Sequence, residues 1–149
     1  MKEPDDCEAR SKMAQASLQA GLAFTNAILG ATHAMSHQVG GLLDAPHGVL
    51  LPHVIRYNAR ATPERFVALA RSAGLTVDGM PGDEGAELLA QHVRSLADDV
   101  GVPRGLRELG VSEADVSRLA HTTLDDACLA TNPRSASEGD IETLFRAAL

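Results

Sequence analysis

The stretch EARSKMAQASLQAGLAFTNAILGATHAMSHQ, residues 8–38, decides the fold class because it has the composition of one long helix. Ala, Leu and Met are frequent in it, and these residues have high intrinsic helix propensity. Asp5 and Asp6 precede it, and their carboxylates can cap the first free backbone N–H groups. Beyond Ala20 the polar face nearly vanishes, so we expect this half of the helix to be buried on most sides. The glycine pair at 40–41 is predicted to end it.

The rest of the chain also favours helices. Aromatic residues make up 3% of the 149 residues and there is no Trp, whereas strands favour aromatic and β-branched side chains. Thr62, Ser112 and Ser137 are expected to cap three later helices. We therefore predict one all-α domain over residues 1–149, a bundle of five or six helices. The helices after the first are expected over residues 49–59, 63–75, 85–102, 112–130 and 137–149.

Charge and composition exclude several classes of protein. The net charge of −7 would repel a phosphate backbone, so no nucleic-acid partner is expected. No apolar stretch reaches the roughly 18 residues of a membrane span, and the first residues lack a signal-peptide core. Cys7 and Cys128 are far apart and in no CxxC pair, which indicates free thiols in a reducing compartment. A cytoplasmic protein without a membrane partner is predicted.

Three histidines, His33, His37 and His47, fall within fifteen residues. His33 and His37 are four apart, so on a helix both imidazoles lie on one face. Histidine suits divalent ions such as Zn²⁺ and Fe²⁺, which usually need three or more protein ligands. Asp44 can ligate a metal or form a turn equally well. This density on an otherwise apolar helix favours a metal site over three histidines with ordinary hydrogen bonds.

Common catalytic motifs do not account for these histidines. A zincin protease needs HExxH with a Glu general base after the first His, and Ala34 stands at that position. The sequence also contains no GxSxG nucleophile elbow, no Walker loop and no GxGxxG dinucleotide motif.

Four segments resemble a known family. They are GLAFTNAILGATHAMSHQVGGLLDAPHG (21–48), LLPHVIRYNA (50–59), DDACLATNPR (125–134) and DIETLFRAAL (140–149). They are similar to the C-terminal helical domain of the iron-containing (group III) alcohol dehydrogenases, which implies the dehydroquinate-synthase-like α-domain fold. The resemblance runs from about residue 6 to the last residue. Its most specific features are the HAMxH and PHG motifs, separated by a fourteen-residue step.

The resemblance implies roles for individual residues. His33 and His47 match two ligands of the catalytic divalent metal, Fe²⁺ or Zn²⁺, and His37 matches a cleft residue associated with proton transfer and cofactor contact. Phe24 matches an aromatic residue lining the substrate pocket, and Cys128 a position on its other wall. The implied reaction is hydride transfer between a small alcohol or aldehyde and NAD(P), with the metal as Lewis acid.

The sequence departs from the family pattern in two respects. It lacks the N-terminal α/β domain, which in the family supplies the NAD(P) site and the other metal ligands, an aspartate and a third histidine. We therefore expect weak metal binding, no activity of the chain alone, and a need for an NAD-binding half in trans or a second copy. The family usually has PHGxxNAxLLPHV, whereas here only Val49 separates His47-Gly48 from Leu50. This shortening predicts a helix start near 49–52, with His47 displaced or on a loop.

Two further functions remain open at this level. The chain is alternatively a relic or repurposed helical module that binds a partner or dimerises and has no redox activity. A third interpretation is a small independent metalloenzyme that uses His33, His37 and His47 with an open coordination position.

Overall fold

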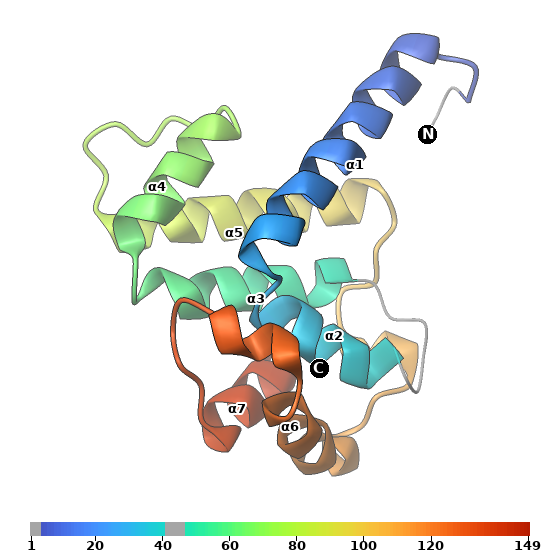
Figure 1. Cartoon of the computed structure of the whole chain (residues 1–149), viewed down its shortest axis with the longest axis vertical. Coiled ribbons are helices and arrows are strands. Elements are labelled where there is room, and N and C mark those ends of the chain that lie inside the picture. Colours follow the sequence, from blue (N-terminus) through green and yellow to red (C-terminus); the bar gives the residue numbers. More distant parts are fainter. Residues whose placement is uncertain (1–3, 41–46) are drawn as a thin grey trace.

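The computed structural model describes residues 4–40 and 47–149 and is built of helices (Figure 1). Within these ranges it has seven α-helices, three 3₁₀ helices and no strand, which confirms the all-α prediction. No helix in the described part of the chain combines the length and apolar character needed to cross a membrane. The elements are α1 (Cys7–Ala27), α2 (Ala31–Gly40), α3 (His47–Ala59), α4 (Pro63–Ser72), α5 (Gly82–Asp99), η1 (Leu106–Leu109), η2 (Glu113–Asp115), α6 (Val116–Leu124), η3 (Ala127–Thr131) and α7 (Glu138–Ala148).

The first predicted helix is broken in two, so the expectation of one continuous helix to residue 38 is wrong. Ile28 ends α1 with φ 58°, and Gly30 has φ 87°, before α2 begins. The N–H of Gly30 donates to the Cys128 carbonyl at 2.9 Å, and that of Ala31 donates to Asn132 Oδ1 at 3.0 Å. These distant partners redirect the chain, and the break accounts for seven α-helices rather than five or six.

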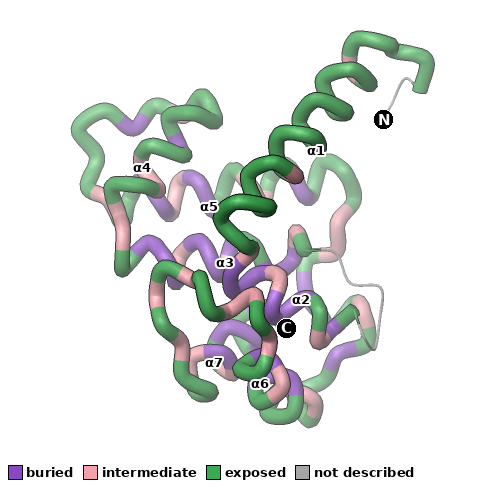
Figure 2. The backbone as a smooth tube through the Cα atoms, in the orientation of Figure 1, coloured by how far each residue is buried: buried purple, intermediate pink, exposed green. Residues whose placement is uncertain are grey.

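Burial of this stretch also differs from the expectation. Asp6 caps α1 as predicted, since its Oδ1 accepts the N–H groups of Glu8 and Ala9 at 3.0 Å. All of α1 is described, and none of its residues is buried, although its second half was expected to be (Figure 2). The deep burial begins only at Gly30 and continues into α2.

The main core lies between α2, α3, α6 and α7. It consists of apolar side chains that interdigitate with almost no exposure, the state that burial of apolar area favours. The short η1 turn adds Leu106 to it. The largest fully buried members are Phe145, Met35, Leu50, Leu106, Leu119 and Ile141.

A second, smaller cluster lies on the other side of α3. It includes Ile55, Ala70, Leu89 and Ala90, from α3, α4 and α5. Helix α3 therefore contributes to both clusters, and it packs against α2, α5 and α7. This central position sets where the N-terminal residues of α3 lie relative to α2.

Helix α3 begins earlier than predicted. His47 is its first described residue, rather than a loop residue before a start at 49–52. The helix passes through Pro52, which has no N–H for the carbonyl of Gly48. Pro52 is itself buried in the packing around α3. The shortened segment thus leaves His47 on the helix.

Two of the three predicted later caps form capping boxes, whereas Thr62 precedes α4 without a side-chain cap hydrogen bond. Ser137 and Asp140 form a reciprocal capping box at α7, as predicted for Ser137. Ser112 and Asp115 form the same arrangement, but it opens the η2 turn before α6. The expected helix over 112–130 is therefore divided into η2, α6 and η3. Asp126 begins η3 by accepting the Cys128 N–H at its Oδ1, 2.9 Å away.

Candidate metal centre

His33 and His47 come together where α2 meets the start of α3. Their ring centroids are 4.5 Å apart and the planes are tilted by 56°. The prediction that His47 is displaced or left on a loop is wrong, because α3 includes this residue and its ring lies close to that of His33. Two imidazoles at this spacing can bind one divalent ion.

The charge state of the pair suits a metal. Burial, followed by the neighbouring His47 and His37, lowers the pKa of His33. Burial and the nearby His37 likewise lower the pKa of His47. Both rings are therefore neutral at pH 7, and neutral imidazole is the form that ligates. The two residues fit the resident metal that the family resemblance implies, as part of a larger ligand set.

Ser36 orients His47, a role that sequence reasoning missed. Its Oγ lies 2.7 Å from His47 Nε2 and 3.0 Å from the His33 carbonyl oxygen, and the residue is buried. The place of Ser36 between His33 and His37 in the sequence could have suggested a role at the site. It could not have shown the contact with His47 on α3. A metal that binds at Nε2 of His47 must replace this hydrogen bond.

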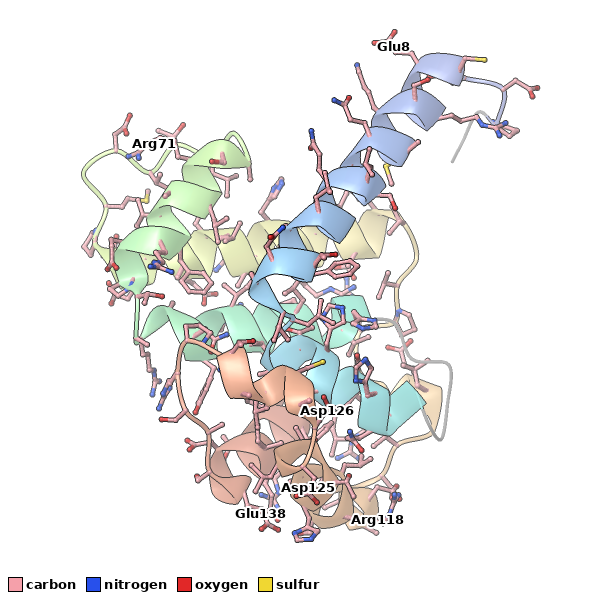
Figure 3. The ribbon with its side chains drawn as sticks, in the orientation of Figure 1. Glu8, Arg71, Arg118, Asp125, Asp126 and Glu138 are labelled. Carbon is pink, nitrogen blue, oxygen red and sulfur yellow. The ribbon has the colours of Figure 1, made fainter. Side chains whose placement is uncertain are left out.

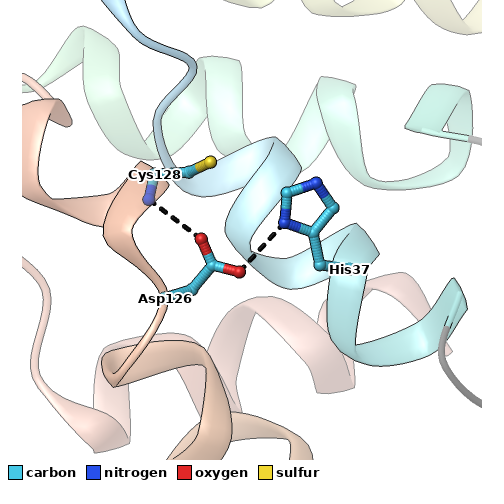
Figure 4. Close-up of side chains that lie close together, drawn as sticks. All are labelled: His37, Asp126 and Cys128. Atoms are coloured by element: carbon cyan, nitrogen blue, oxygen red, sulfur yellow. Dashed lines mark hydrogen bonds and ion pairs between the residues drawn. The ribbon is translucent and has the colours of Figure 1, made fainter.

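His37 is directed to a different partner. Its Nδ1 lies 2.9 Å from Asp126 Oδ2 (Figure 4), while its ring centroid is 6.1 Å from that of His33. Gln38 Nε2 also donates to Asp126 Oδ2, at 3.3 Å. The carboxylate therefore fixes the orientation of the His37 ring, as a second partner on a functional histidine commonly does.

Asp126 was also missed from the sequence. Burial would raise the pKa of this carboxyl, but hydrogen bonds from His37 and the Cys128 N–H outweigh it, so the pKa is lowered. Figure 3 shows Asp126 beside α2, while its neighbour Asp125 is exposed near the end of α6. The DDAC sequence alone did not indicate which acid turns inward.

Cys128 is half-buried on η3, next to Asp126. Burial, and then the hydrogen bond and charge of Asp126, raise the pKa of its thiol. Both cysteines are free, as predicted, and Cys7 is exposed on α1. The thiol is thus protonated at neutral pH unless a cation replaces its proton.

The remaining residues singled out from the sequence differ in their exposure. Phe24 lies on α1 and is 48% exposed, so its place on a substrate-pocket wall opposite Cys128 stays a prediction. Asp44 lies outside the described residues. His53 is half-buried, and His92 and His121 are exposed, in agreement with the expected core or surface positions.

Comparisons with known proteins identify the family to which the chain belongs. The sequence profile of the Fe-containing alcohol dehydrogenase family, C-terminal, matches residues 1–149. The chain is 48% identical over 145 residues to 1,3-propanediol dehydrogenase of Citrobacter freundii, covering 95% of this chain and 38% of the relative. It is 42% identical over 147 residues to lactaldehyde reductase of Escherichia coli strain K12, and this match covers 96% of this chain and 38% of the relative.

A solved structure of 1,3-propanediol oxidoreductase superposes with a TM-score of 0.93 at 44% identity. The match covers 97% of this chain and 39% of that one. The chain thus spans about two fifths of the length of these relatives, in the part that carries the helices described above. It belongs to the iron-containing alcohol dehydrogenase family and corresponds to the C-terminal helical domain of that family.

Proposed function

We propose that this chain is the metal-binding half of an NAD(P)-dependent alcohol dehydrogenase acting on a small alcohol or aldehyde. The observation that carries the proposal is the His33–His47 pair, with ring centroids 4.5 Å apart and both pKa values lowered. The family resemblance supports the same two residues as ligands. The chain alone is proposed to be inactive, because its relatives are more than twice its length.

In this proposal, His33 and His47 hold the ion as neutral nitrogen ligands. Bound Fe²⁺ or Zn²⁺ supplies Lewis-acid polarisation of the alcohol or carbonyl oxygen. Ser36 holds the His47 ring in place before the ion binds, through the contact at Nε2 that an ion bound at that nitrogen would replace. The remaining ligands and the NAD(P) site are proposed to come from an N-terminal half that corresponds to the part of the relatives outside the match.

His37 is proposed to transfer the proton of the alcohol. Asp126 accepts a hydrogen bond from His37 Nδ1–H, which leaves Nε2 as the nitrogen able to take up or release a proton. The His37 side chain is 47% exposed, so Nε2 is accessible. Phe24 and Cys128 are proposed to line the substrate pocket, which requires that a partner covers α1.

Metal content tests the proposal. In equilibrium dialysis against Fe²⁺ or Zn²⁺, the purified chain is expected to bind metal, and His33→Ala and His47→Ala are each expected to bind about one equivalent less. His121→Ala is the matched control, because His121 is exposed and far along the chain on α6. Metal retention at the level of the control in both site variants would contradict the assignment of these ligands.

Activity is the second measurement. The chain alone is expected to show no NAD(P)-linked alcohol oxidation, and addition of an N-terminal NAD-binding half from a family member is expected to restore it. Restored activity that persists in His33→Ala would exclude the proposed role of that residue. Loss in His33→Ala with retention in His121→Ala supports it.

A second candidate function follows from the exposure of α1. The chain is alternatively a helical binding or dimerisation module without redox activity, with apolar side chains of α1 as its contact surface. Sedimentation equilibrium of the metal-free chain tests this candidate. A dimer that is weakened by Leu22→Ser would favour the dimerisation module over the dehydrogenase half. The exposed apolar residues concerned are Met13, Leu18, Leu22, Phe24 and Ile28.

A further inference from the structure

A second group of metal-ligating side chains lies beside the His33–His47 pair. One ring nitrogen of His37, one carboxylate oxygen of Asp126 and Sγ of Cys128 all lie within 4.8 Å of one another (Figure 4). In residues 4–40 and 47–149 it is the one such group of three His, Cys, Asp or Glu. It joins α2 to η3 across 89 residues of sequence.

The backbone around this group is fixed by contacts outside it. The N–H of Gly30 donates to the carbonyl of Cys128, and Asp126 Oδ1 accepts the N–H of Cys128, each at 2.9 Å. Asn132, at the other end of η3, accepts the Ala31 N–H. The start of α2 and the η3 turn are therefore locked together, and two of the three ligands have a settled backbone position.

The donor set has the charge that a divalent cation needs. A carboxylate and a thiolate carry two negative charges, and neutral His37 adds a nitrogen. Zn²⁺ accepts all three donor types, and sites with three protein ligands leave a fourth position for water. The His33–His47 pair, in contrast, offers two neutral ligands and no compensating charge.

The spacing is close to that of a bound ion. Tetrahedral zinc holds nitrogen at about 2.0–2.1 Å and sulfur at about 2.3 Å, so its ligand atoms lie about 3.3–3.8 Å apart. A closure of about 1 Å is then needed, and the 47% exposed His37 ring has room to make it. Asp126 is only 14% exposed, so few waters must be displaced from its carboxylate.

We propose that His37, Asp126 and Cys128 form a second site for a zinc-like divalent cation, separate from the His33–His47 pair. Binding replaces one proton, that of the Cys128 thiol, which passes to solvent. If His37 binds through Nδ1, its proton moves to Nε2 and no further proton is released. The site does not use His33 or His47, so it does not rest on the ligands of the proposed function. While its ion is bound, His37 is a ligand and does not transfer a proton.

Cadmium titration tests the site, because Cd²⁺ bound to a thiolate has an ultraviolet charge-transfer band. The chain is expected to develop this band with one equivalent bound at the thiol and about one proton released. Cys128→Ser is expected to abolish the band, and Asp126→Asn to weaken binding at least about tenfold. Cys7→Ser is the matched control and is expected to keep the band, because Cys7 is exposed on α1.

The double variant His33→Ala/His47→Ala separates this proposal from the proposed function. It is expected to lose the first site and keep the cadmium–thiolate band. Loss of the band in this variant, with its circular dichroism unchanged, would show that the thiol belongs to one joint site and would overturn the proposal. The same conclusion follows if the unmutated chain develops no band, or if the band survives in Cys128→Ser.

A second measurement leaves all three ligands unchanged. In the Cys7→Ser variant, Zn²⁺ is expected to slow alkylation of Cys128 by iodoacetamide by at least about tenfold, and a chelator is expected to reverse this. His33→Ala/His47→Ala in the same background is expected to retain the protection. Equal alkylation rates with and without Zn²⁺ would overturn the proposal even if Cys128→Ser fails to fold.

Discussion

Helices α1 and α2 come from one continuous stretch of similar composition, yet they have opposite environments. No residue of α1 is buried, whereas α2 buries Ala31, Thr32, Ala34, Met35, Ser36 and Val39. Apolar side chains are frequent in both helices. Composition therefore predicts that both are helical, but not whether another part of the chain covers them. The segment Ile28–Gly30, where the chain changes direction, separates the two environments.

The difference has a functional counterpart. The face of α2 carries His33 and His37, and both are positioned by contacts with α3 and η3. Helix α1 carries Phe24 in an exposed position. The proposed metal ligands therefore lie together within the chain, while the proposed pocket wall on α1 requires a covering partner.

The largest expected effect is a contrast between two methionines. Met35 on α2 is fully buried, so Met35→Ala is expected to lower the free energy of unfolding by about 2–5 kcal/mol through lost burial and a cavity. Met13 on α1 is 62% exposed, and Met13→Ala is expected to change it by less than about 0.5 kcal/mol. Urea denaturation followed by circular dichroism measures both. Similar losses in the two variants would contradict the difference in packing.

A second pair compares glycines. Gly30 has φ 87°, and a Cβ there would lie 3.1 Å from Asn132 Oδ1, so Gly30→Ala is expected to cost about 1–3 kcal/mol. Gly21 lies inside α1, and a Cβ there would meet nothing within 4 Å. Gly21→Ala is therefore expected to stabilise the chain by up to about 1 kcal/mol through helix propensity. Thermal unfolding of both variants checks that the two changes in stability have opposite signs. An unchanged stability of Gly30→Ala would show that α2 does not depend on this turn.

The comparison also shows which parts of the fold are local. Asp6 and Ser137 were predictable as caps, because each cap bonds to N–H groups within three residues. The break after Ala27 was not, because it depends on Asn132, which lies 101 residues from Ala31 in the sequence. Helix propensity summed along the stretch contains no information about such a partner.

The candidate site divides in the same way. The four-residue spacing of His33 and His37 placed both on α2, as predicted. The partner of His37 was not predictable, since Asp126 is 89 residues away. The inference that His47 is displaced or on a loop was wrong because it set the helix start at 49–52 from Pro52, whereas α3 passes through Pro52 and includes His47.

A smaller effect is expected in the pH dependence of stability. The pKa of His33 is lowered in the folded chain, first by burial and then by His47 and His37, while in the unfolded chain it lies near the ordinary value of about 6.5. As the pH falls below that value, the unfolded state takes up a proton that the folded state resists. Stability is therefore retained above about pH 6.5 and decreases as the pH falls toward the lower folded pKa.

Replacement of His33 should flatten this dependence. We expect the stability of metal-free His33→Gln to decrease less between pH 7.5 and 5 than that of the unmutated chain, measured by urea denaturation with a chelator present. Met13→Ala on α1 is the control and is expected to keep the original slope. An unchanged slope in His33→Gln would mean that the ring is as well hydrated in the folded chain as in the unfolded one.

The smallest expected effect lies on α1 itself. Leu22 is exposed, so Leu22→Ser is expected to change the free energy of unfolding by less than about 0.5 kcal/mol. The measurement is thermal unfolding at two protein concentrations about a hundredfold apart, because a second copy that covers α1 would make stability depend on concentration. A loss that grows with concentration would show that α1 is buried between copies of this chain. An effect near zero at both concentrations leaves the apolar face of α1 available to the proposed NAD-binding half, as the proposed function requires.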